Sequence, residues 1–141
     1  MSTKVKKNKL EVKKNQEDEY TVVHEVSDCK LNIETTTDGK SYLQQTGKKH
    51  TKTIDDVNIE GTMDNLKSDE GQKIIRDMTW KENDEARLYV KHTQASTGDT
   101  VEGIAICDIS SPTGGSADDD DQTSFKLLFD GIPTINGQTA E

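Results

Sequence analysis

The sequence has few of the residues that usually hold a small fold together. Of its 141 residues, 29% are hydrophobic, 4% are aromatic and only two are cysteines. Two cysteines argue against a secreted scaffold built on several disulfides. No stretch approaches the roughly 20 apolar residues that a membrane-spanning helix needs, and no secretory apolar segment opens the chain. We therefore expect a protein that is made and kept in a reducing cytoplasm, without membrane partners.

The charge balance adds to this shortage of apolar side chains. The net charge is −9 at pH 7, and Leu, Ile, Val and Phe make up 27 of the 141 residues, or 19%. Such a composition is typical of disordered chains, and we expect flexible ends: a basic arm at residues 1–9 and a tail at residues 132–141. In residues 10–131, apolar and polar side chains alternate strictly in six places, which predicts one folded domain. Self-association would complete its small core.

One segment, residues 69–79, has helical periodicity. Ser68 is well placed as the N-cap, and Asp69 and Glu70 put negative charge at the positive end of the helix. Gly71 costs such a helix about 1 kcal/mol relative to alanine, so packing against a sheet must hold the helix in place. The residues expected to make this packing are Ile74, Ile75, Met78 and Trp80.

The other periodic segments alternate with period two, which predicts strands. Residues 10–13 and 20–26 are expected to form a hairpin with lysines on its outer face. Ile54 is out of phase with Val57 and Ile59, which predicts a bulge at Asp55 and Asp56. Further strands are expected at residues 28–36, 53–61, 87–91, 100–110 and 123–130. The fold class predicted is mainly β (α+β), with one flanking helix.

Two polar segments interrupt these strands. Residues 37–52 have only Tyr42 and Leu43 as apolar bulk, and a loop this long inside a compact domain is usually functional. It is either a projecting arm with an aromatic anchor that docks on a neighbour or a disordered segment. Residues 111–122 form an acidic loop with four consecutive aspartates, at positions 118–121. They lack the glycine and the distal glutamate of a helix-loop-helix calcium site, so we expect a solvated loop.

No pattern of catalytic residues stands out. The sequence has no phosphate-binding glycine loop, nucleophile motif or paired-cysteine zinc spacing. Cys29 and Cys107 fall at inward strand positions, which is typical of buried thiols. His24 has no partner at metal-ligand spacing, and His50 and His92 have no carboxylate or nucleophile beside them. The sequence thus predicts a protein that is not an enzyme, with no catalytic residues, no metal site and no cofactor.

The order of the parts resembles the major tail protein, or tail tube protein, of long-tailed, siphovirus-type bacteriophages. The resemblance covers residues 10–131 and rests on a succession of segments. These are the strand VSDCKLNIETT, the polar segment TDGKSYLQQTGKKHTK, the return strand IDDVNIEGT, the helix SDEGQKIIRDM, the strand ARLYVKH, and the pair DTVEGIAICDIS and TSFKLLFDG. A strand that ends at Gly61 before a turn and helix is similar to the family's arrangement. So is a strand with Gly103 that leads through a polar loop to a final strand.

The resemblance implies a β-sandwich of about six to eight antiparallel strands with the flanking helix, assembling as hexameric rings that stack into a tube around passing DNA. Its partners would be copies of itself and other tail proteins, such as the tape measure, tail terminator and distal tail proteins. It would act in the virion tail and be assembled in the host cytoplasm. The residues carried over to a ring-stacking loop are Gly39, Lys40, Tyr42, Leu43, Lys48 and Lys49.

The same resemblance places the strands at residues 28–36 and 53–61 in the tube wall, with one face toward the lumen. DNA carries one negative charge per roughly 1.7 Å of axis, so carboxylates on that face would repel it and keep it from sticking. Lys30 opposes this effect. A bulge could turn either face inward, because a shift of one residue exchanges the two faces of a strand. The candidate acidic lumen residues are Glu34, Asp56 and Glu60.

Two other functions fit the same pattern. Tube proteins of tailocins or of secretion-type contractile systems share the architecture. A virion decoration or binding module would instead contact a ligand through its basic hairpin or its aspartate loop. Such a module would stay monomeric, and its binding would survive deletion of residues 37–52.

Overall fold

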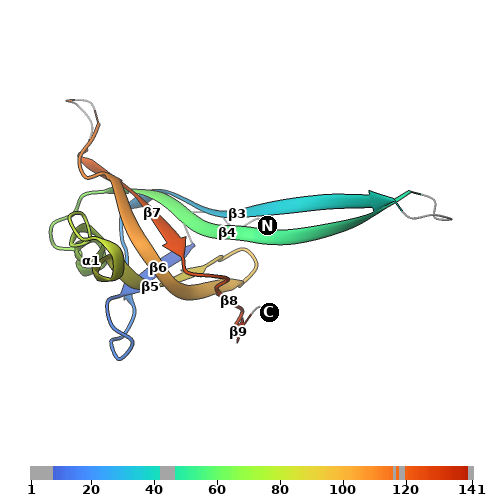
Figure 1. Cartoon of the computed structure of the whole chain (residues 1–141). Coiled ribbons are helices and arrows are strands. Elements are labelled where there is room, and N and C mark those ends of the chain that lie inside the picture. The colour runs from blue at the N-terminus through green and yellow to red at the C-terminus, as the bar shows by residue number, and fades with distance from the viewer. Residues whose placement is uncertain (1–7, 42–46, 116, 118–119, 140–141) are drawn as a thin grey trace.

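The computed structural model describes residues 8–41, 47–115, 117 and 120–139. In these parts the chain forms one nine-stranded sheet with a single short α-helix beside it (Figure 1). The prediction of a mainly β fold with one flanking helix is confirmed. The elements are β1 (Lys9–Lys13), β2 (Thr21–Val22), β3 (Val26–Ser41), β4 (Lys48–Asp64), α1 (Glu70–Arg76), the 3-10 helix η2 (Asn83–Ala86), β5 (Arg87–Thr93), β6 (Thr100–Ser111), β7 (Gln122–Phe129), β8 (Thr134–Ile135) and β9 (Gln138–Thr139).

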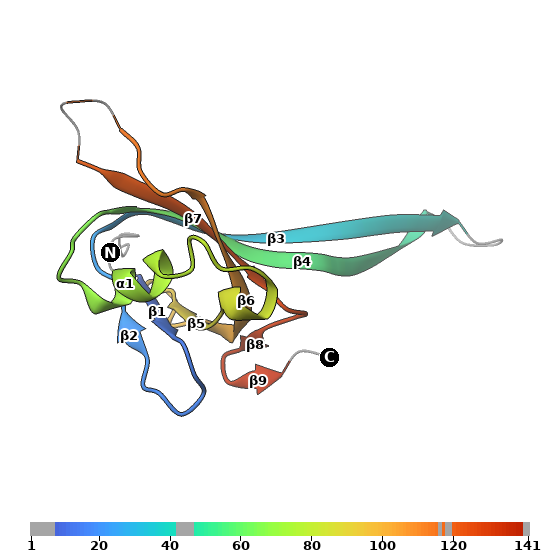
Figure 2. The same cartoon turned by 60° about the vertical axis from the view of Figure 1, so that its left-hand side comes forward.

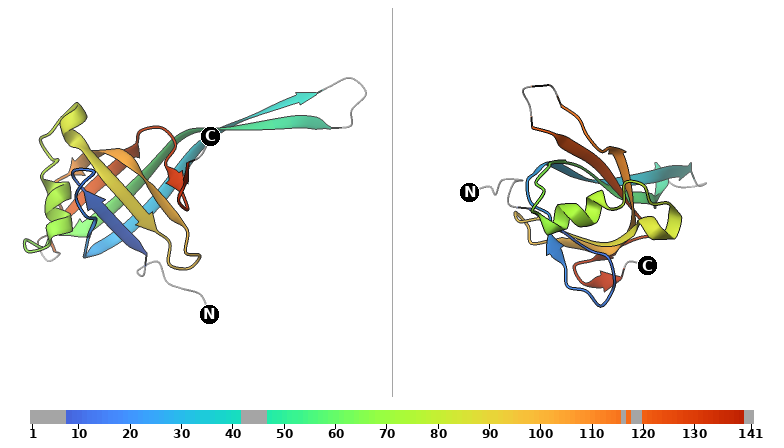
Figure 3. Two further views of the ribbon diagram at one scale, coloured as in Figure 1. Left: turned by 90° about the horizontal axis from the view of Figure 1, so that it is seen from below. Right: turned by 90° about the vertical axis from the view of Figure 1, so that its left-hand side faces the viewer.

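All described strand pairs are antiparallel, and the strand order is β2-β1-β5-β6-β7-β4-β3. The strands that we expected in a sandwich therefore belong to one continuous hydrogen-bonded sheet. This sheet curls around the core, as Figure 3 shows. As a result, Leu10 of β1 and His92 of β5 line the same small cavity as Cys29 of β3, although β3 lies at the opposite edge of the sheet.

Alternation of side chains along the strands builds the core. In β7 every second residue is buried, from Thr123 through Phe125 and Leu127 to Phe129. The strand β5 alternates in the same way. Because successive side chains of a strand point to opposite faces, this pattern places one face of each strand inside the curl and the other outside. The sequence expectation for these strands holds.

The helix α1 begins one residue later than the sequence predicted. Asp69, and not Ser68, is the N-cap, and its carboxylate accepts a hydrogen bond from the Gln72 amide at 3.0 Å. Ile75 and Met78 are buried and Ile74 packs partly against the core. The expected packing of Trp80 is wrong, since this residue is 88% exposed. The helix ends at Arg76, so the helical spacing that would have brought Trp80 to the core does not continue that far.

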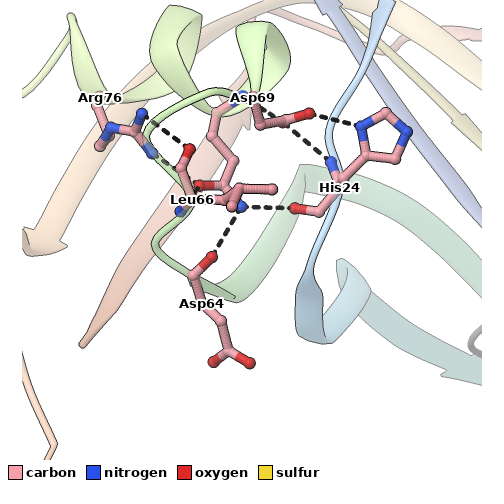
Figure 4. Close-up of polar contacts among 6 residues, drawn as sticks. His24, Asp64, Leu66, Asp69 and Arg76 are labelled. Carbon is pink, nitrogen blue, oxygen red and sulfur yellow. Dashed lines mark hydrogen bonds and ion pairs between the residues drawn. The ribbon is translucent and has the colours of Figure 1, made fainter. Parts of the chain in front are cut away.

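Gln72 is the polar centre of the contact between α1 and the sheet. Figure 4 labels its four partners among the residues drawn. Its side chain is fully buried and makes four hydrogen bonds. The amide nitrogen donates to the carbonyls of His24 and Asp64, and the oxygen accepts from the Leu66 amide and from Arg76. A buried polar group that loses its hydrogen-bond partner costs free energy. The four bonds therefore hold three segments in place relative to one another: α1, the segment at His24 and the segment at residues 64–66.

Asp69 connects the helix to the segment that leads into β3. Its second carboxylate oxygen lies 2.5 Å from His24 Nδ1, and the His24 amide donates to the same side chain at 3.2 Å. His24, for which the sequence offered no partner at metal-ligand spacing, therefore has a carboxylate partner 45 residues away in the chain.

The expectation of an unstructured C-terminal tail is wrong for residues 134–139. The strand β8 pairs with β6 at Val101 and Glu102, and β9 pairs with β8. Asn136 anchors the turn between them, because its side chain accepts a hydrogen bond from the Thr100 amide at 2.7 Å. At the other end, β1 begins at Lys9, inside the expected flexible arm, and residues 1–7 of that arm lie outside the described residues.

Candidate assembly surface

The strands β3 and β4 form a hairpin that extends far beyond the body of the protein (Figures 1 and 2). They are paired from Val26 opposite Met63 to Ser41 opposite Lys48. The expectation of a loop over residues 37–52 is therefore corrected: residues 37–41 and 48–52 are strand. A two-stranded ribbon with no core on either face needs no apolar residues. Its sequence is therefore as polar as that of a loop, which is why a loop was expected here.

The hairpin has a bulge where the sequence predicted one. Glu34 lies opposite Asp56, whereas Thr35 lies opposite Ile54, so Asp55 is the extra residue. The Asp55 carboxylate accepts a hydrogen bond from the Thr36 hydroxyl, which ties the bulge to the opposite strand. Beyond this point, all described side chains of residues 35–40 and 47–53 are exposed. The bulge thus separates the part of the hairpin that belongs to the sheet from the part that projects.

The projecting part carries a basic stripe on one face. Cross-strand partners share a face, and Ile54, opposite Thr35, packs partly against the core. Because side chains alternate along β4, every second residue from Ile54 toward the tip lies on the same face as Ile54. We call the residues of this face, Lys48, His50 and Lys52, the basic stripe. Opposite His50 stands Gly39, where a Cβ would lie 3.1 Å from the imidazole.

The residues carried over to a ring-stacking loop fall on this hairpin. Lys48 belongs to the basic stripe, and Gly39 lies on the same face. Lys40 and Lys49 lie opposite each other on the other face. Tyr42 and Leu43 lie outside the described residues.

The three acidic candidates for a tube lumen share the outer face of the sheet, which points away from the core. Glu34 and Asp56 are direct cross-strand neighbours, and Glu60 lies opposite Lys30. Glu60 also faces Lys126 of β7, with 3.6 Å between the carboxylate and the ammonium. Sequence analysis missed Lys126, which only strand pairing brings to this face. The face is therefore mixed in charge, and exposed ion pairs of this kind contribute little to stability.

A buried asparagine holds part of the outer face in place. Asn58 is 1% exposed, and it lies beside Leu128 of β7. Its oxygen accepts from Asn32 at 3.1 Å, and its amide donates to Asp56 at 2.9 Å. Asp56 is thus half-buried and partnered, whereas Glu34 and Glu60 are exposed.

The described residues offer little for chemistry. Among them, no group of three or more His, Cys, Asp or Glu side chains could hold a metal ion. Burial raises the pKa of the Cys29 thiol to about 11 and that of Cys107 to about 12, so both remain protonated at neutral pH and are poor nucleophiles. Burial also lowers the pKa of His92. Within the described part of the chain, no helix is long and apolar enough to cross a membrane.

The fold defines a class: a curled, mainly β domain with one flanking helix and a long projecting hairpin. Solved structures that share this fold include two from gene transfer agent particles. One is a chain in the tail of an empty gene transfer agent particle with C6 symmetry, with a TM-score of 0.71 and 12% identity over 99% of this chain and 100% of that one. The other comes from the virion of a native gene transfer agent, with a TM-score of 0.62 and 13% identity over 93% and 95% of the two chains.

Comparing the sequence with family models and with curated proteins found no relative. No protein-family model matches the chain, and no curated protein matches it. At 12–13% identity the structural likeness establishes the fold. It extends over nearly the whole chain, and at the level of the fold it confirms the resemblance to phage tail tube proteins.

Proposed function

We propose that the protein is a structural subunit of a phage-like tail, which forms hexameric rings that stack into a tube and conduct DNA. The observation that carries this proposal is the projecting hairpin. An isolated two-stranded ribbon is marginally stable in water, and the part beyond Ile54 buries none of its described side chains. Such a ribbon gains its partners when another copy covers it, and the chain that shares this fold in a gene transfer agent tail stands in a C6-symmetric assembly.

In this function the hairpin contacts the next ring. Gly39, Lys40, Lys48 and Lys49 would lie in the contact, and Tyr42 and Leu43 would serve as its anchors. The protein would be part of the virion tail and would meet tape measure, terminator and distal tail proteins at the ends of the tube.

The outer face of the sheet would line the lumen. Glu34 and Glu60 are exposed there, and Lys30 and Lys126 accompany them. Charges of both signs would keep the wall hydrated, and the carboxylates would offset the attraction between its lysines and the DNA phosphates. The lumen would therefore let DNA pass without holding it.

Electron microscopy of the purified protein at rising concentration tests the proposal. We expect six-fold rings and tubes with a central channel. A protein that remains monomeric at high concentration, both alone and with the tail proteins encoded beside it, would overturn the proposal. A decoration or binding module would show that monomeric behaviour.

A further inference from the structure

The projecting hairpin and the rest of the chain carry net charges of opposite sign. Four lysines and one aspartate give residues 35–54 a net charge of +3, so the rest of the chain must carry −12 to give the total of −9. In Figure 1 the hairpin points away from one end of the body, and α1 and the segment after it lie at the other end. A head-to-tail arrangement of copies therefore brings a basic element toward an acidic body.

The segment after α1 has an unusual surface. Trp80, the sole tryptophan, is 88% exposed. It lines a shallow hollow together with Glu82, Asn83, Asp84 and Glu85. Asp84 already pairs with Arg87, whereas neither Glu82 nor Glu85 has an ion pair among the described residues. We call the surface formed by these five residues the tryptophan hollow.

A tryptophan face flanked by carboxylates is suited to a cation. The ring attracts ammonium groups through its quadrupole, and tryptophan is the best of the aromatic side chains at this. An exposed tryptophan also provides a large apolar area that a monomer gains nothing by leaving in water. The chemistry of the hollow therefore fits a lysine-bearing segment better than an apolar one.

The basic stripe supplies such a segment. Lys48 and Lys52 are exposed, have no ion pair among the described residues, and share one face of β4 with His50. At roughly 3.3 Å per residue, the strand from Ile54 to Lys48 projects about 20 Å. This reach allows it to cross from one copy onto the next.

We propose that the basic stripe of one copy docks in the tryptophan hollow of the next copy along the tube, with Lys48 and Lys52 against Trp80, Glu82 and Glu85. This inference rests on the proposed function, since it names the receiving surface for the stacking hairpin. The two surfaces differ and lie at opposite ends, so the contact is heterologous. It does not close on itself and can repeat along an axis.

The sole tryptophan allows a direct test with the unaltered protein. On tube formation, the emission of Trp80 shifts to shorter wavelength, and its quenching by acrylamide falls several-fold. Carbodiimide treatment of tubes joins Lys48 or Lys52 to Glu82 or Glu85, which mass spectrometry of the digested protein detects. Tubes in which Trp80 stays fully quenchable and no such cross-link forms would overturn the inference.

Charge reversal gives a second test. Lys48→Glu with Lys52→Glu abolishes tube formation, and so does Glu82→Lys with Glu85→Lys, because each places like charges in contact. All four changes in one chain restore the tubes. The matched control, Lys14→Glu with Glu17→Lys in the exposed turn after β1, assembles normally.

The possible results separate the inference from the proposed function. If the four-fold variant forms no tubes, or if Asp120→Lys in the acidic loop restores the Lys48→Glu, Lys52→Glu protein instead, the inference is wrong and the tube function stands. If the wild-type protein forms no tubes under any condition, both are wrong.

Discussion

At the scale of single residues, Asp69 couples the start of α1 to the rest of the fold. Burial acts to raise the pKa of its carboxyl, but hydrogen bonds from the Gln72 amide and from His24 outweigh burial and hold the pKa below its usual 3.8. A carboxylate whose pKa is lower in the folded state stabilises that state at pH values above its unfolded-state pKa. This stabilisation is lost as the pH falls through the folded-state pKa.

We therefore expect the free energy of unfolding to fall as the pH is lowered from about 5 toward 2. Asp69→Ala should cost about 1–2 kcal/mol at neutral pH, through loss of the cap. Asp69→Asn keeps a good capping residue but cannot titrate, so its stability should depend less on pH over this range. Urea unfolding of the three proteins at several pH values measures both effects. An Asn variant with the same acid dependence as the wild type would contradict the assignment.

Gly71 shows how position decides the effect of a residue. As a helical glycine it predicted a cost of about 1 kcal/mol relative to alanine. In the structure, a Cβ at this position would lie 2.3 Å from the carbonyl oxygen of Val22. Because backbone atoms cannot move aside easily, the absence of a side chain is what allows α1 to pack against β2.

Gly71→Ala should therefore destabilise the protein by about 1–3 kcal/mol, the usual cost of overpacking, although alanine favours the helix. Lys73→Ala, at an exposed position of the same helix, is the matched control and should change stability by less than about 0.5 kcal/mol. Urea unfolding measures both variants. A Gly71→Ala protein more stable than the wild type would show that the contact is looser than the structure indicates.

At the scale of elements, the hairpin can be separated from the body. Thr36 and Thr53 are direct cross-strand partners, so residues 37–52 can be replaced by Asn-Gly, which favours a two-residue hairpin turn. The side chains of residues 37–40 and 47–52, which this replacement removes, are all exposed. The free energy of unfolding should change by less than about 1 kcal/mol, while tube formation should be lost.

Chemical denaturation and electron microscopy of the shortened protein provide these two measurements. Normal tubes would remove the hairpin from the stacking contact. A body that no longer folds would show that the ribbon stabilises the sheet.

At the scale of the whole molecule, the charge of the outer face decides how a tube treats DNA. Glu34→Lys with Glu60→Lys replaces two exposed carboxylates on this face with ammonium groups. The two new lysines add to Lys30 and Lys126. Tubes of this variant should retain DNA in a salt-dependent manner, whereas wild-type tubes should not. Co-sedimentation of DNA with tubes measures the difference. Glu17→Lys with Glu19→Lys, at exposed positions in the turn between β1 and β2, is the control, and equal retention by both variants would place the lumen elsewhere.

The sequence by itself determined the strands of the body, the helix and the bulge at Asp55. Local periodicity reports these features because each side chain either faces a core or faces water. It could not reveal the hairpin beyond the bulge, since a ribbon exposed on both faces has no such alternation. The strands β8 and β9 were missed because two residues each are too few to show a period.

Only the tertiary structure decided which distant residues meet. Gln72 is an ordinary polar helix residue in the sequence, and its burial depends on carbonyls at His24 and Asp64. Trp80 was expected to pack where the helix meets the sheet, yet α1 ends too early to carry it there. The side-by-side position of Glu60 and Lys126 also depends on pairing across 66 residues. Contacts of this kind arise from the order of strands in the sheet, which local sequence patterns do not record.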